Sequence, residues 1–564
     1  MANLNFWLTQ SLFNPDHNPL ITVDFEGFAD EHWYPYHESM VSVSPVFTLT
    51  NHYPVEANGR PIQYVKTTSY FDDFYNRIHI SPSSLELGNV ASEQSQNVLV
   101  WNAHLTPKIL IDIENIPEGI NLSGQSNPPL VFTALQELTW DVSILPDGPS
   151  TIDTTLVWRF STEQADLRIT GTRIIAFGFL VDWSKPVNES LQWLTNILQS
   201  SSGHEQRRSL RLAPRISYEA DLLLYEQERQ YFENIIVGWF DRTFAVPVWN
   251  HQQWLKTAHN AGGLVIYCDT THRNFRANRL AILRSENAFD NETVEVESVL
   301  PDRLILKRPL IKNWSVGTCL SPALTAQLEV APSMIKRTDR MMRTRVIFNV
   351  VEQVDYSQTP LSTIYRTYPV LTEKPNETND LTHSHERLIQ SLDNSTGRFL
   401  KVDTARAAFQ VYQYAWMTHG RQQQASLKNL FYSLRGSQKA IWVPTFSDDL
   451  TVLSNNVSTT NSLTIAFCGY TRFSLNELSK RDIRIELKNG QILYRRIVAA
   501  AELSTTEELI ELDQNFDNVN KNTVVSISFM SLCRLSSDTV NIEHINDSDG
   551  IAKCAVTWRG VRES

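Results

Sequence analysis

The stretch YFENIIVGWFDRTFAVPVW (231–249) decides the fold, because its pattern occurs a second time as SLKNLFYSLRGSQKAIWVPTF (426–446). In each stretch, apolar residues stand at i, i+3, i+4 and i+7, the spacing that buries one face of a helix. These residues are Phe232, Ile235, Ile236 and Trp239 in the first stretch and Leu427, Leu430, Phe431 and Leu434 in the second. Each helix pattern leads to a Val-Pro pair and an aromatic residue. The sequence therefore predicts two related units, each with a helix that runs into a strand.

The likeness continues after the helices. GLVIYC (263–268) is echoed by SLTIAFC (462–468), DRLILKRPL (302–310) by EELIELDQNF (507–516), and RTRVIFNVVE (343–352) by IAKCAVTWRGV (551–561). IRIELKNGQILYRRI adds a hairpin in the second copy, because Asn489-Gly490 is a turn signal between antiparallel strands. We therefore predict two homologous tandem β-rich domains with one packed helix each, at 205–352 and 395–564. A polar connector, 353–394, joins them.

The repeated segments supply the structural anchors of both domains. We predict these to be Phe232, Ile236, Trp239, Pro247 and Trp249 in the first copy, and Leu427, Phe431, Leu434, Pro444 and Phe446 in the second. A functional alternative is a sugar- or peptide-stacking platform built from Trp249, Trp254 and Phe446. The structural interpretation is favoured, because Pro is typical of a strand's edge or first residue and the polar residues that follow do not recur.

Residues 79–178 predict an immunoglobulin-like β-sandwich. Short β-patterned runs are separated by turn signals about every ten residues, as expected for a sandwich. The runs are NVLVWN (97–102), KILIDIE (108–114), TWDVSIL (139–145), TLVWRFS (155–161) and LRITGTRIIAF (167–177). The segment resembles PapD-like and ASH-type immunoglobulin folds through Leu87-Gly88, Trp101-Asn102 and Gly171-Thr172-Arg173. Such sandwiches are adhesive or scaffold modules, although a fold alone does not fix a function.

Two further segments flank the sandwich. Residues 1–78 are aromatic-rich, as in HWYPYH (32–37), and predict an N-terminal arm or a small β-domain. Residues 179–204 predict a helical connector, because Leu191, Leu194, Ile197 and Leu198 follow helical spacing behind Pro186. The predicted fold class is thus mainly β with minor α.

Composition excludes several classes of protein. The 564 residues are 42% hydrophobic with a net charge of -12, which argues for folded domains and against a dedicated nucleic-acid-binding protein. The five cysteines have no framework spacing, so we expect free thiols in a protein made in the cytoplasm. No secretory signal is expected at the N-terminus, and the longest apolar run, IIAFGFLV (174–181), is too short for a membrane anchor.

Enzyme motifs are not found. The sequence has no GxSxG, P-loop, GxGxxG or HExxH pattern. The pairs Asp72-Asp73 and Asp448-Asp449 are expected to be solvated, the histidines of THSHE (382–386) are not expected to bind metal, and Cys268 and Cys468 are expected to be small buried apolar residues. We therefore expect no catalytic, cofactor-binding or metal-binding residues.

One family resemblance bears on function. DWSKPVNESLQWLTNILQSSSGHEQRRSLRLAPR (182–215) and GWFDRTFAVPVW (238–249) resemble tail-tip, or baseplate, proteins of long non-contractile-tailed bacteriophages. LDNSTGRF (392–399) and FYSLRGSQKAIWVPTFSDDL (431–450) resemble the second half of the same proteins. The resemblance covers residues 182–450, and its type within the tail tip (hub, distal-tail or adaptor) stays open.

The resemblance implies a non-enzymatic virion protein, assembled in the host cytoplasm and located at the tail tip. Three chains with two ring-forming domains each would close into a homotrimeric, pseudo-hexameric ring. Its partners would be tail-tube, other tail-tip and fibre proteins, and DNA would pass the channel without specific binding. The alternatives are a receptor- or glycan-binding tail protein and a cell-wall hydrolase. The hydrolase would need paired carboxylates or a zinc triad, and neither is evident.

Overall fold

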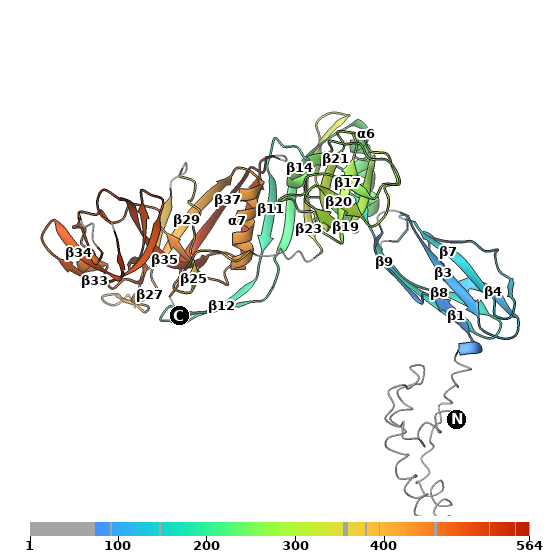
Figure 1. Ribbon diagram of the computed structural model, residues 1–564, viewed down its shortest axis with the longest axis horizontal. Helices are drawn as coiled ribbons and strands as arrows, with labels where there is room; N and C mark the ends of the chain where they lie inside the picture. The colour runs from blue at the N-terminus through green and yellow to red at the C-terminus, as the bar shows by residue number, and fades with distance from the viewer. Residues whose placement is uncertain are drawn as a thin grey trace, which may run out of the picture. The chain divides into compact units, whose positions relative to one another are not determined.

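The computed structural model describes residues 74–90, 93–145, 148–149, 151–352, 359–377, 381–393, 395–455, 459–517, 519–546 and 549–562. The predicted N-terminal arm lies outside these residues except for its last few positions. The chain divides into two compact units, Met1–Ile174 and Ile175–Ser564. Strands dominate both units and helices are few, so the predicted mainly-β class is confirmed (Figure 1).

The first unit consists of two β-sheets. Their strand orders are β1-β3-β7-β5 and β2-β9-β8-β4-β6. The strands are β1 (Ile78–Ser81), β2 (Ser84–Val90), β3 (Gln94–Asn102), β4 (Lys108–Glu114), β5 (Ile120–Ser123), β6 (Leu130–Phe132), β7 (Glu137–Ile144), β8 (Thr151–Phe160) and β9 (Gln164–Arg173). Alternate residues of both sheets are buried in one apolar core, in which the rings of Trp140 and Trp158 meet edge to face at 6.1 Å. Alternation of this kind is what a two-sided sheet requires.

The predicted sandwich boundary at residue 178 is wrong by a few residues. β9 ends at Arg173, and the chain then enters β10 (Ile175–Ala176), which pairs with a strand of the second unit. Phe177 and Phe179 are fully buried in the core of that second unit. The run LRITGTRIIAF (167–177), predicted as one strand of the sandwich, is divided between β9 and β10, because pattern alone does not show which core a strand joins.

The second unit contains two modules of the same element order. The first module consists of β14 (Arg215–Tyr225), α6 (Glu226–Trp239), β15 (Phe244–Pro247), β17 (Val265–Tyr267), β18 (Arg279–Arg284), β19 (Asn291–Leu300), β20 (Arg303–Leu306), β21 (Cys319–Leu328), β22 (Met334–Lys336) and β23 (Met341–Val350). The second consists of β29 (Phe409–Thr418), α7 (Arg421–Leu434), β30 (Ile441–Pro444), β31 (Thr460–Ala466), β32 (Asp482–Leu487), β33 (Ile492–Glu502), β34 (Glu507–Phe516), β35 (Val524–Leu535), β36 (Thr539–His544) and β37 (Ala552–Gly560).

Strand pairing also follows one scheme in both modules. β14 pairs with β23 as β29 does with β37, and β15 pairs with β21 as β30 does with β35. β18 lies between β19 and β21 as β32 lies between β33 and β35. β20 pairs with β17 and β19, and its counterpart β34 pairs with β31 and β33. β22 pairs with β23 as β36 pairs with β37. The pairings agree with the predicted duplication, and a common origin of the two modules stays a prediction.

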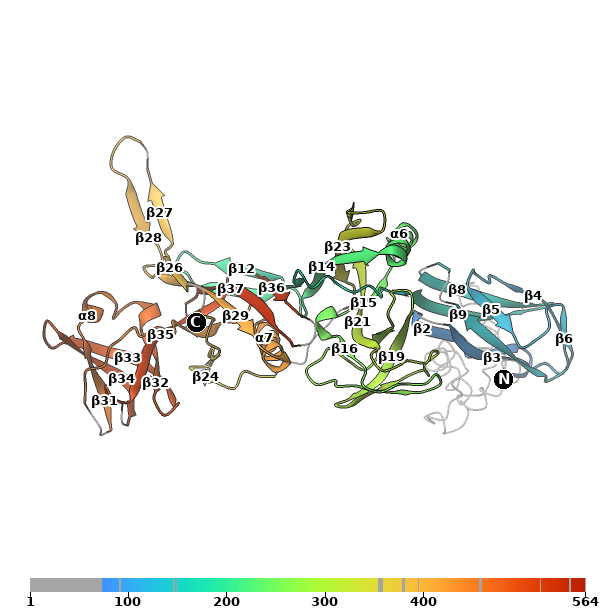
Figure 2. The ribbon, with the colours of Figure 1, turned by 90° about the horizontal axis from the view of Figure 1, so that it is seen from above.

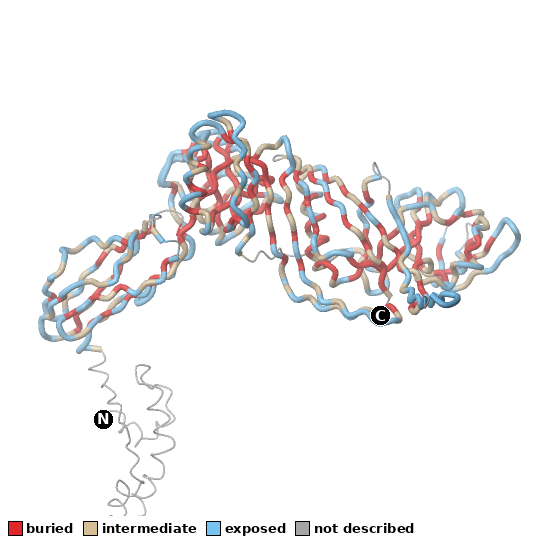
Figure 3. The backbone as a smooth tube through the Cα atoms, turned by 180° about the vertical axis from the view of Figure 1, so that it is seen from behind, coloured by how far each residue is buried: buried red, intermediate tan, exposed pale blue. Residues whose placement is uncertain are grey.

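The two modules share one large apolar core. It includes the buried faces of α6 and α7 together with residues of β14, β23, β29 and β37 (Figure 3). Each module has a second, separate core beneath its smaller strands, around Ile266 and Leu320 in the first and around Ile465 and Ile510 in the second. Each module is therefore a helix-covered sheet with a small β-subdomain attached.

The predicted helical connector at 179–204 is wrong. This segment forms β11 (Val187–Gln192) and β12 (Thr195–Gln199), and β12 pairs with β13 (Glu205–Ser209) in a hairpin. Leu191 is fully buried, whereas Leu194 and Leu198 are 41% and 62% exposed, which no common helix face would allow. Alternation of buried residues along β11 takes precedence over the helical spacing, because short apolar runs fit either period.

The predicted polar connector at 353–394 also contains strands. Its described residues form β24 (Ile364–Tyr365), β25 (Tyr368–Pro369), β26 (Thr382–Glu386) and β27 (Ile389–Leu392). β26 pairs with β29, and β27 pairs with β28 (Leu400–Asp403) in a hairpin that projects from the rest of its unit (Figure 2). The predicted boundary at 394 is wrong, because it separates β27 from its partner β28. A polar composition does not distinguish an exposed edge strand such as β26 from a connector.

Candidate functional site

The candidate site is the junction where strand β11 joins the two modules. One edge of β11 pairs with β14 of the first module, and its other edge pairs with β36 of the second. The strand thus lies between the modules and makes their sheets continuous (Figure 1). A strand paired on both edges holds both neighbours through main-chain hydrogen bonds. β11 is therefore the element that sets how one module meets the next.

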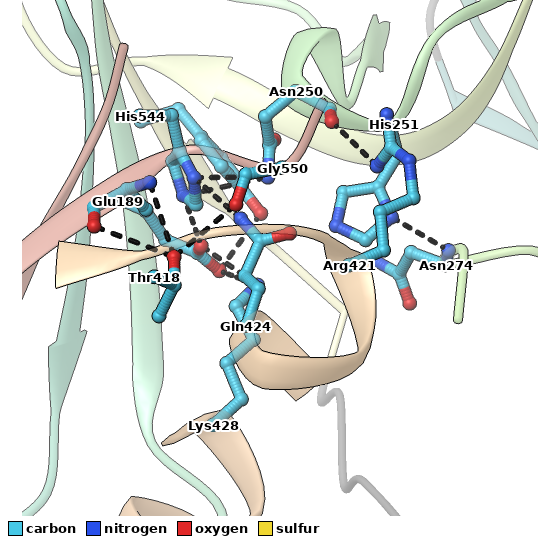
Figure 4. Close-up of polar contacts among 12 residues, drawn as sticks. Glu189, Asn250, His251, Asn274, Thr418, Arg421, Gln424, Lys428, His544 and Gly550 are labelled. Atoms are coloured by element: carbon cyan, nitrogen blue, oxygen red, sulfur yellow. Dashed lines mark hydrogen bonds and ion pairs between the residues drawn. The ribbon is translucent and has the colours of Figure 1, made fainter. Parts of the chain in front are cut away.

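Glu189 lies at the centre of this junction and is fully buried (Figure 4). Its carboxylate accepts hydrogen bonds from the Nζ of Lys428 on α7 at 2.8 Å and from the Nε2 of His544 on β36 at 2.8 Å. Tyr218 on β14 donates its hydroxyl to the same carboxylate at 3.0 Å. One side chain therefore joins groups from both modules, and a buried carboxylate needs such partners to remain ionised.

His544 extends this network to the first module. Its Nε2 donates to Glu189, which leaves Nδ1 to accept from the amide of Gln424 at 2.7 Å and from Asn250 at 3.3 Å. The neutral tautomer with the proton on Nε2 satisfies the bonds to Glu189 and Gln424, and the longer contact with Asn250 shares the single lone pair of Nδ1. Asn250 also accepts a hydrogen bond from Arg421 through its main-chain oxygen at 2.9 Å. The loop after β15 is therefore bound to both α7 and β36.

The charges at the junction are set by burial and by one another. Burial alone would raise the pKa of Glu189, but Lys428 and His544 hold it well below its ordinary value. Burial lowers the pKa of His544 despite its bond to Glu189, and burial together with Lys428 and Arg421 lowers the pKa of His251. The junction therefore contains an ionised carboxylate and two neutral imidazoles near neutral pH.

We expect stability to fall as the pH falls below about 6.5. The unfolded chain then protonates His544 and His251 while the folded chain resists protonation, so the unfolded state binds more protons. A further loss is expected below about 4.5, where the unfolded chain protonates Glu189 and the folded chain keeps it ionised. Urea unfolding over this pH range measures the effect, and His544→Gln should reduce the slope near pH 6. A free energy of unfolding that stays constant across the range would contradict it.

A cavity of about 600 Å³ adjoins the junction. It lies between the His251 and Asn274 loops of the first module, the segment 359–373, and the face of α7 that carries Gln424. His251 accepts the main-chain N–H of Asn274 at Nδ1 (3.0 Å), so its Nε2 carries a proton, and that buried atom has no partner in the described structure. The side-chain amide of Asn274 and the oxygen of Gln424 are likewise unsatisfied. These groups could hold a small polar molecule.

The β12–β13 hairpin lies along the second module although it precedes the first in sequence. Its base is fixed by Thr195, which donates its main-chain N–H to Asp538 at 2.6 Å, and by Trp193, whose ring meets Tyr432 edge to face at 5.6 Å. Glu205 accepts hydrogen bonds from both Arg534 and Arg559 at 2.7–3.0 Å. The hairpin therefore reinforces the contact that β11 makes.

The sequence-predicted anchors lie in the cores, with one exception. Phe232, Ile236, Trp239, Pro247, Trp249, Leu427, Phe431, Leu434 and Pro444 are all buried. Phe446 is half-buried and has a left-handed backbone with φ of 55°. It packs at the rim of the shared core near Tyr414 and the guanidinium of Arg484.

The three aromatics of the stacking alternative do not form one platform. Trp249 is fully buried and donates its indole N–H to Phe179 at 3.0 Å, whereas Trp254 in β16 (Gln253–Trp254) is 52% exposed. Trp254→Ala is expected to change the free energy of unfolding by less than about 1 kcal/mol, because a half-exposed ring contributes little packing. Chemical denaturation tests this, and loss of binding to host glycans by the same variant would revive the alternative.

The other polar residues of the sequence prediction have different roles. Asp448 is exposed, as expected, and Asp449 is half-buried. Both accept main-chain N–H groups of β35, at 3.2 and 2.8 Å, and Asp449 also contacts Thr445. Cys268 is half-buried and packs against the core around Ile266, whereas Cys468 is exposed, so the expectation of a buried thiol is wrong at Cys468. Thiols at strand ends reach the surface when the strand leaves the core. Asp72-Asp73 lies outside the described residues.

His383 and His385 lie on exposed β26. In the part of the chain that the structure describes, no cluster of three or more His, Cys, Asp or Glu side chains could hold a metal ion. No helix in the described ranges is long and apolar enough to cross a membrane.

Sequence reasoning missed the residues of the junction. Asn250 and His251 directly follow the repeated Val-Pro-aromatic segment, and Glu189 lay in a stretch read as a helix. The available signal was that Asn250 and His251 do not recur in the second copy. Residues that differ between copies are expected where one copy faces the other, because the two faces of such a contact cannot be the same.

Comparisons with known proteins add little. No family model matches the chain, and no curated protein matches it. Among solved structures, the crystal structure of tripeptidyl peptidase 2 is matched with a TM-score of 0.15 and 8% identity, over 88% of this chain and 33% of that chain. The chain thus spans about a third of the length of that structure, and a similarity this low supports no statement about fold or activity.

Proposed function

We propose that this chain is a non-enzymatic structural protein of the phage tail tip, which forms a ring between the tail tube and the hub, fibre or receptor-binding proteins. The observation that carries the proposal is the junction: two modules of one topology are joined edge to edge through β11, as neighbouring subunits of a ring are joined. Three chains would supply six such modules.

The family resemblance supports the same function. The stretch 182–215 that resembles tail-tip proteins comprises β11 and the β12–β13 hairpin, and the stretch 392–399 comprises the turn of β27–β28. The resemblance therefore includes elements that connect the modules as well as the helix-to-strand segments within them, 238–249 and 431–450. In this proposal the sandwich of the first unit serves as a docking or adhesive module, and the net charge of -12 favours passage of DNA without binding.

Locating the chain in purified particles tests the proposal. Electron microscopy of phage particles labelled with an antibody against residues 175–564 should place the label at the tail tip, with none on heads or empty host membranes. Mass spectrometry of the same particles should detect the chain. Its absence from washed, intact particles would refute the proposed function. The glycan-binding alternative would instead predict saturable binding of the isolated chain to host surface sugars.

A further inference from the structure

The second module has a strand and a hairpin that match the junction elements but have no module to join. β26 pairs with β29 as β11 pairs with β14. Each residue pair of β26 and β29 is the equivalent pair of β11 and β14 shifted by 194 residues: Asn188 pairs with Glu219, and Thr382 pairs with Gln413. The hairpins follow the same shift, as in Thr195 with Ser209 and Ile389 with Asp403. Among the described strands, β36 pairs with the second edge of β11, and none pairs with that edge of β26.

The first module has the matching open edge on β22. β22 pairs with β23 as β36 pairs with β37, which puts Lys336 opposite Met342 where His544 is opposite Ala552. The register of these strands with β14 and β29 agrees, because Phe348 and Trp558 face the equivalent residues Tyr218 and Tyr412. Among the described strands, β22 pairs with β23 alone. An open strand edge of this kind is a template for pairing with another chain.

The projecting β27–β28 hairpin carries exposed apolar residues, whereas its counterpart, β12–β13, is bound to the second module through polar side chains. In β27–β28 and its turn, the exposed residues include Ile389 (53%), Leu392 (59%), Phe399 (62%), Leu400 (58%) and Val402 (46%). The register places Leu392, Leu400 and Val402 on one face of the hairpin. An isolated two-stranded hairpin is marginally stable in water, and exposed apolar residues on one face favour an interaction site. The hairpin stands away from its own unit in Figure 2. It therefore requires a surface that its own module does not supply.

The first module exposes an apolar residue of α6 where the second module is covered at the base of the β12–β13 hairpin. Tyr432, which Trp193 covers, is equivalent to Val237 on α6, because each directly follows an equivalent anchor, Phe431 or Ile236. Val237 is 86% exposed, so this position on α6 is the unoccupied equivalent of a covered one. Ile335 on β22, 61% exposed, is equivalent to Glu543, which is opposite Asn188 of β11 in the internal junction and is exposed there as well.

Charges at the open junction are complementary as well. Glu189, Lys428 and His544 of the internal junction correspond to His383, Glu233 and Lys336. The acidic residue is thus on helix α6 (Glu233) instead of on the strand, and the strand β26 carries a histidine (His383) instead. Glu233 already pairs with Lys336 at 3.2 Å within the first module. A His383 brought to the same relative position as Glu189 would face this acid.

We infer that a second copy of this chain docks head to tail, with β26 and the β27–β28 hairpin of one copy on β22 and α6 of the next. The contact repeats between chains the contact that β11 and β12–β13 make within one chain. It is heterologous, since the two faces differ, and such a contact gives a ring when the rotation from one copy to the next closes. The inference specifies the contact that the proposed ring requires and in that sense rests on the proposed function.

Two complementary double variants test the direction of the contact. F399D/L400D blocks the donating hairpin, and V237D/I335D blocks the receiving face; all four residues are exposed, so both variants should fold. The full chain is expected to form a trimer in native mass spectrometry at micromolar concentration. Each variant alone should be monomeric, and an equimolar mixture should give a heterodimer, because each partner retains the face that the other lacks. Phe473→Asp, at a 79% exposed aromatic on α8 (Tyr470–Phe473), should leave the trimer intact.

Several outcomes would overturn the inference. A wild-type chain that stays monomeric would do so, as would V237D/I335D that self-associates, since this indicates a symmetric contact between hairpins. A mixture of the variants that yields only monomers would also overturn it. These experiments use the purified chain. If the chain were absent from phage particles, the proposed function would be refuted, but the result for the contact between chains would not change.

Cross-linking tests the register independently. In the internal junction Asn188 is opposite Glu543, so Thr382 of one copy should be opposite Ile335 of the next. Chains with T382C and chains with I335C, both in a Cys468→Ser background to remove the exposed thiol, should form a disulfide-linked dimer only when mixed. T382C mixed with K336C should not, because a shift of one residue turns the side chain to the other face. Equal cross-linking of both mixtures would contradict the register.

Discussion

Replacing Glu189 with Gln is expected to lower the free energy of unfolding by about 3–5 kcal/mol, because removing one partner of a buried ion pair leaves the other charge uncompensated. Lys428 is 7% exposed, so its ammonium group would lose its main counter-charge in a buried position. Gln has nearly the shape of Glu, so the loss would report charge rather than packing. Urea unfolding followed by tryptophan fluorescence at neutral pH measures it.

Matched variants separate this charge effect from other causes. Glu219 on neighbouring β14 pairs with Arg345 at a partly exposed site, and Glu219→Gln should cost less than about 1 kcal/mol. The double variant Glu189→Met with Lys428→Met should recover much of the loss, because an apolar pair of similar volume often replaces a buried ion pair. If Glu189→Gln proves as mild as Glu219→Gln, Glu189 does not hold the junction together.

Phe431→Ala is expected to cost about 3–5 kcal/mol, the usual result of emptying a fully buried aromatic site. Phe431 is completely buried on α7 in the core that both modules share. Trp239→Ala on α6 should cost a similar amount, because Trp239 is 8% exposed and also donates its indole N–H to Thr243 at 3.2 Å. Chemical denaturation of both variants provides the measurement.

An exposed aromatic provides the comparison for these losses. Phe473→Ala should leave the free energy of unfolding within about 0.5 kcal/mol of the wild type, since Phe473 is 79% exposed. Losses below about 1 kcal/mol at both Phe431 and Trp239 would argue against helix packing as the source of the module core.

The sequence allowed the two long helices and some of the strands to be predicted, because their apolar periods are long enough to be distinctive. The helical faces from Phe232 to Trp239 and from Leu427 to Leu434 are buried as expected. The segment at 187–199 was misread, because its leucines fit a helix and a strand equally well over so short a span. Only the partner strands β14 and β36, both distant in sequence, decide in favour of a strand.

The candidate site could not be predicted for a related reason. Glu189, Lys428 and His544 come from three distant segments, and no local spacing links them. Asn250 and His251 were set aside because the second copy lacks them. The repeated sequence pattern predicts the two modules, whereas the junction depends on residues such as Asn250 and His251 that occur in one copy only.

The shared strand β11 has a consequence for the order of folding. Glu189 and His544 are 355 residues apart, so the outer edge of β11 cannot be paired until nearly the whole chain has been synthesised. Contacts this distant in sequence form slowly, and unpaired edges are prone to misassembly while they wait. We therefore expect truncated or slowly translated chains to aggregate through β11, and full-length chains to be protected once β36 arrives.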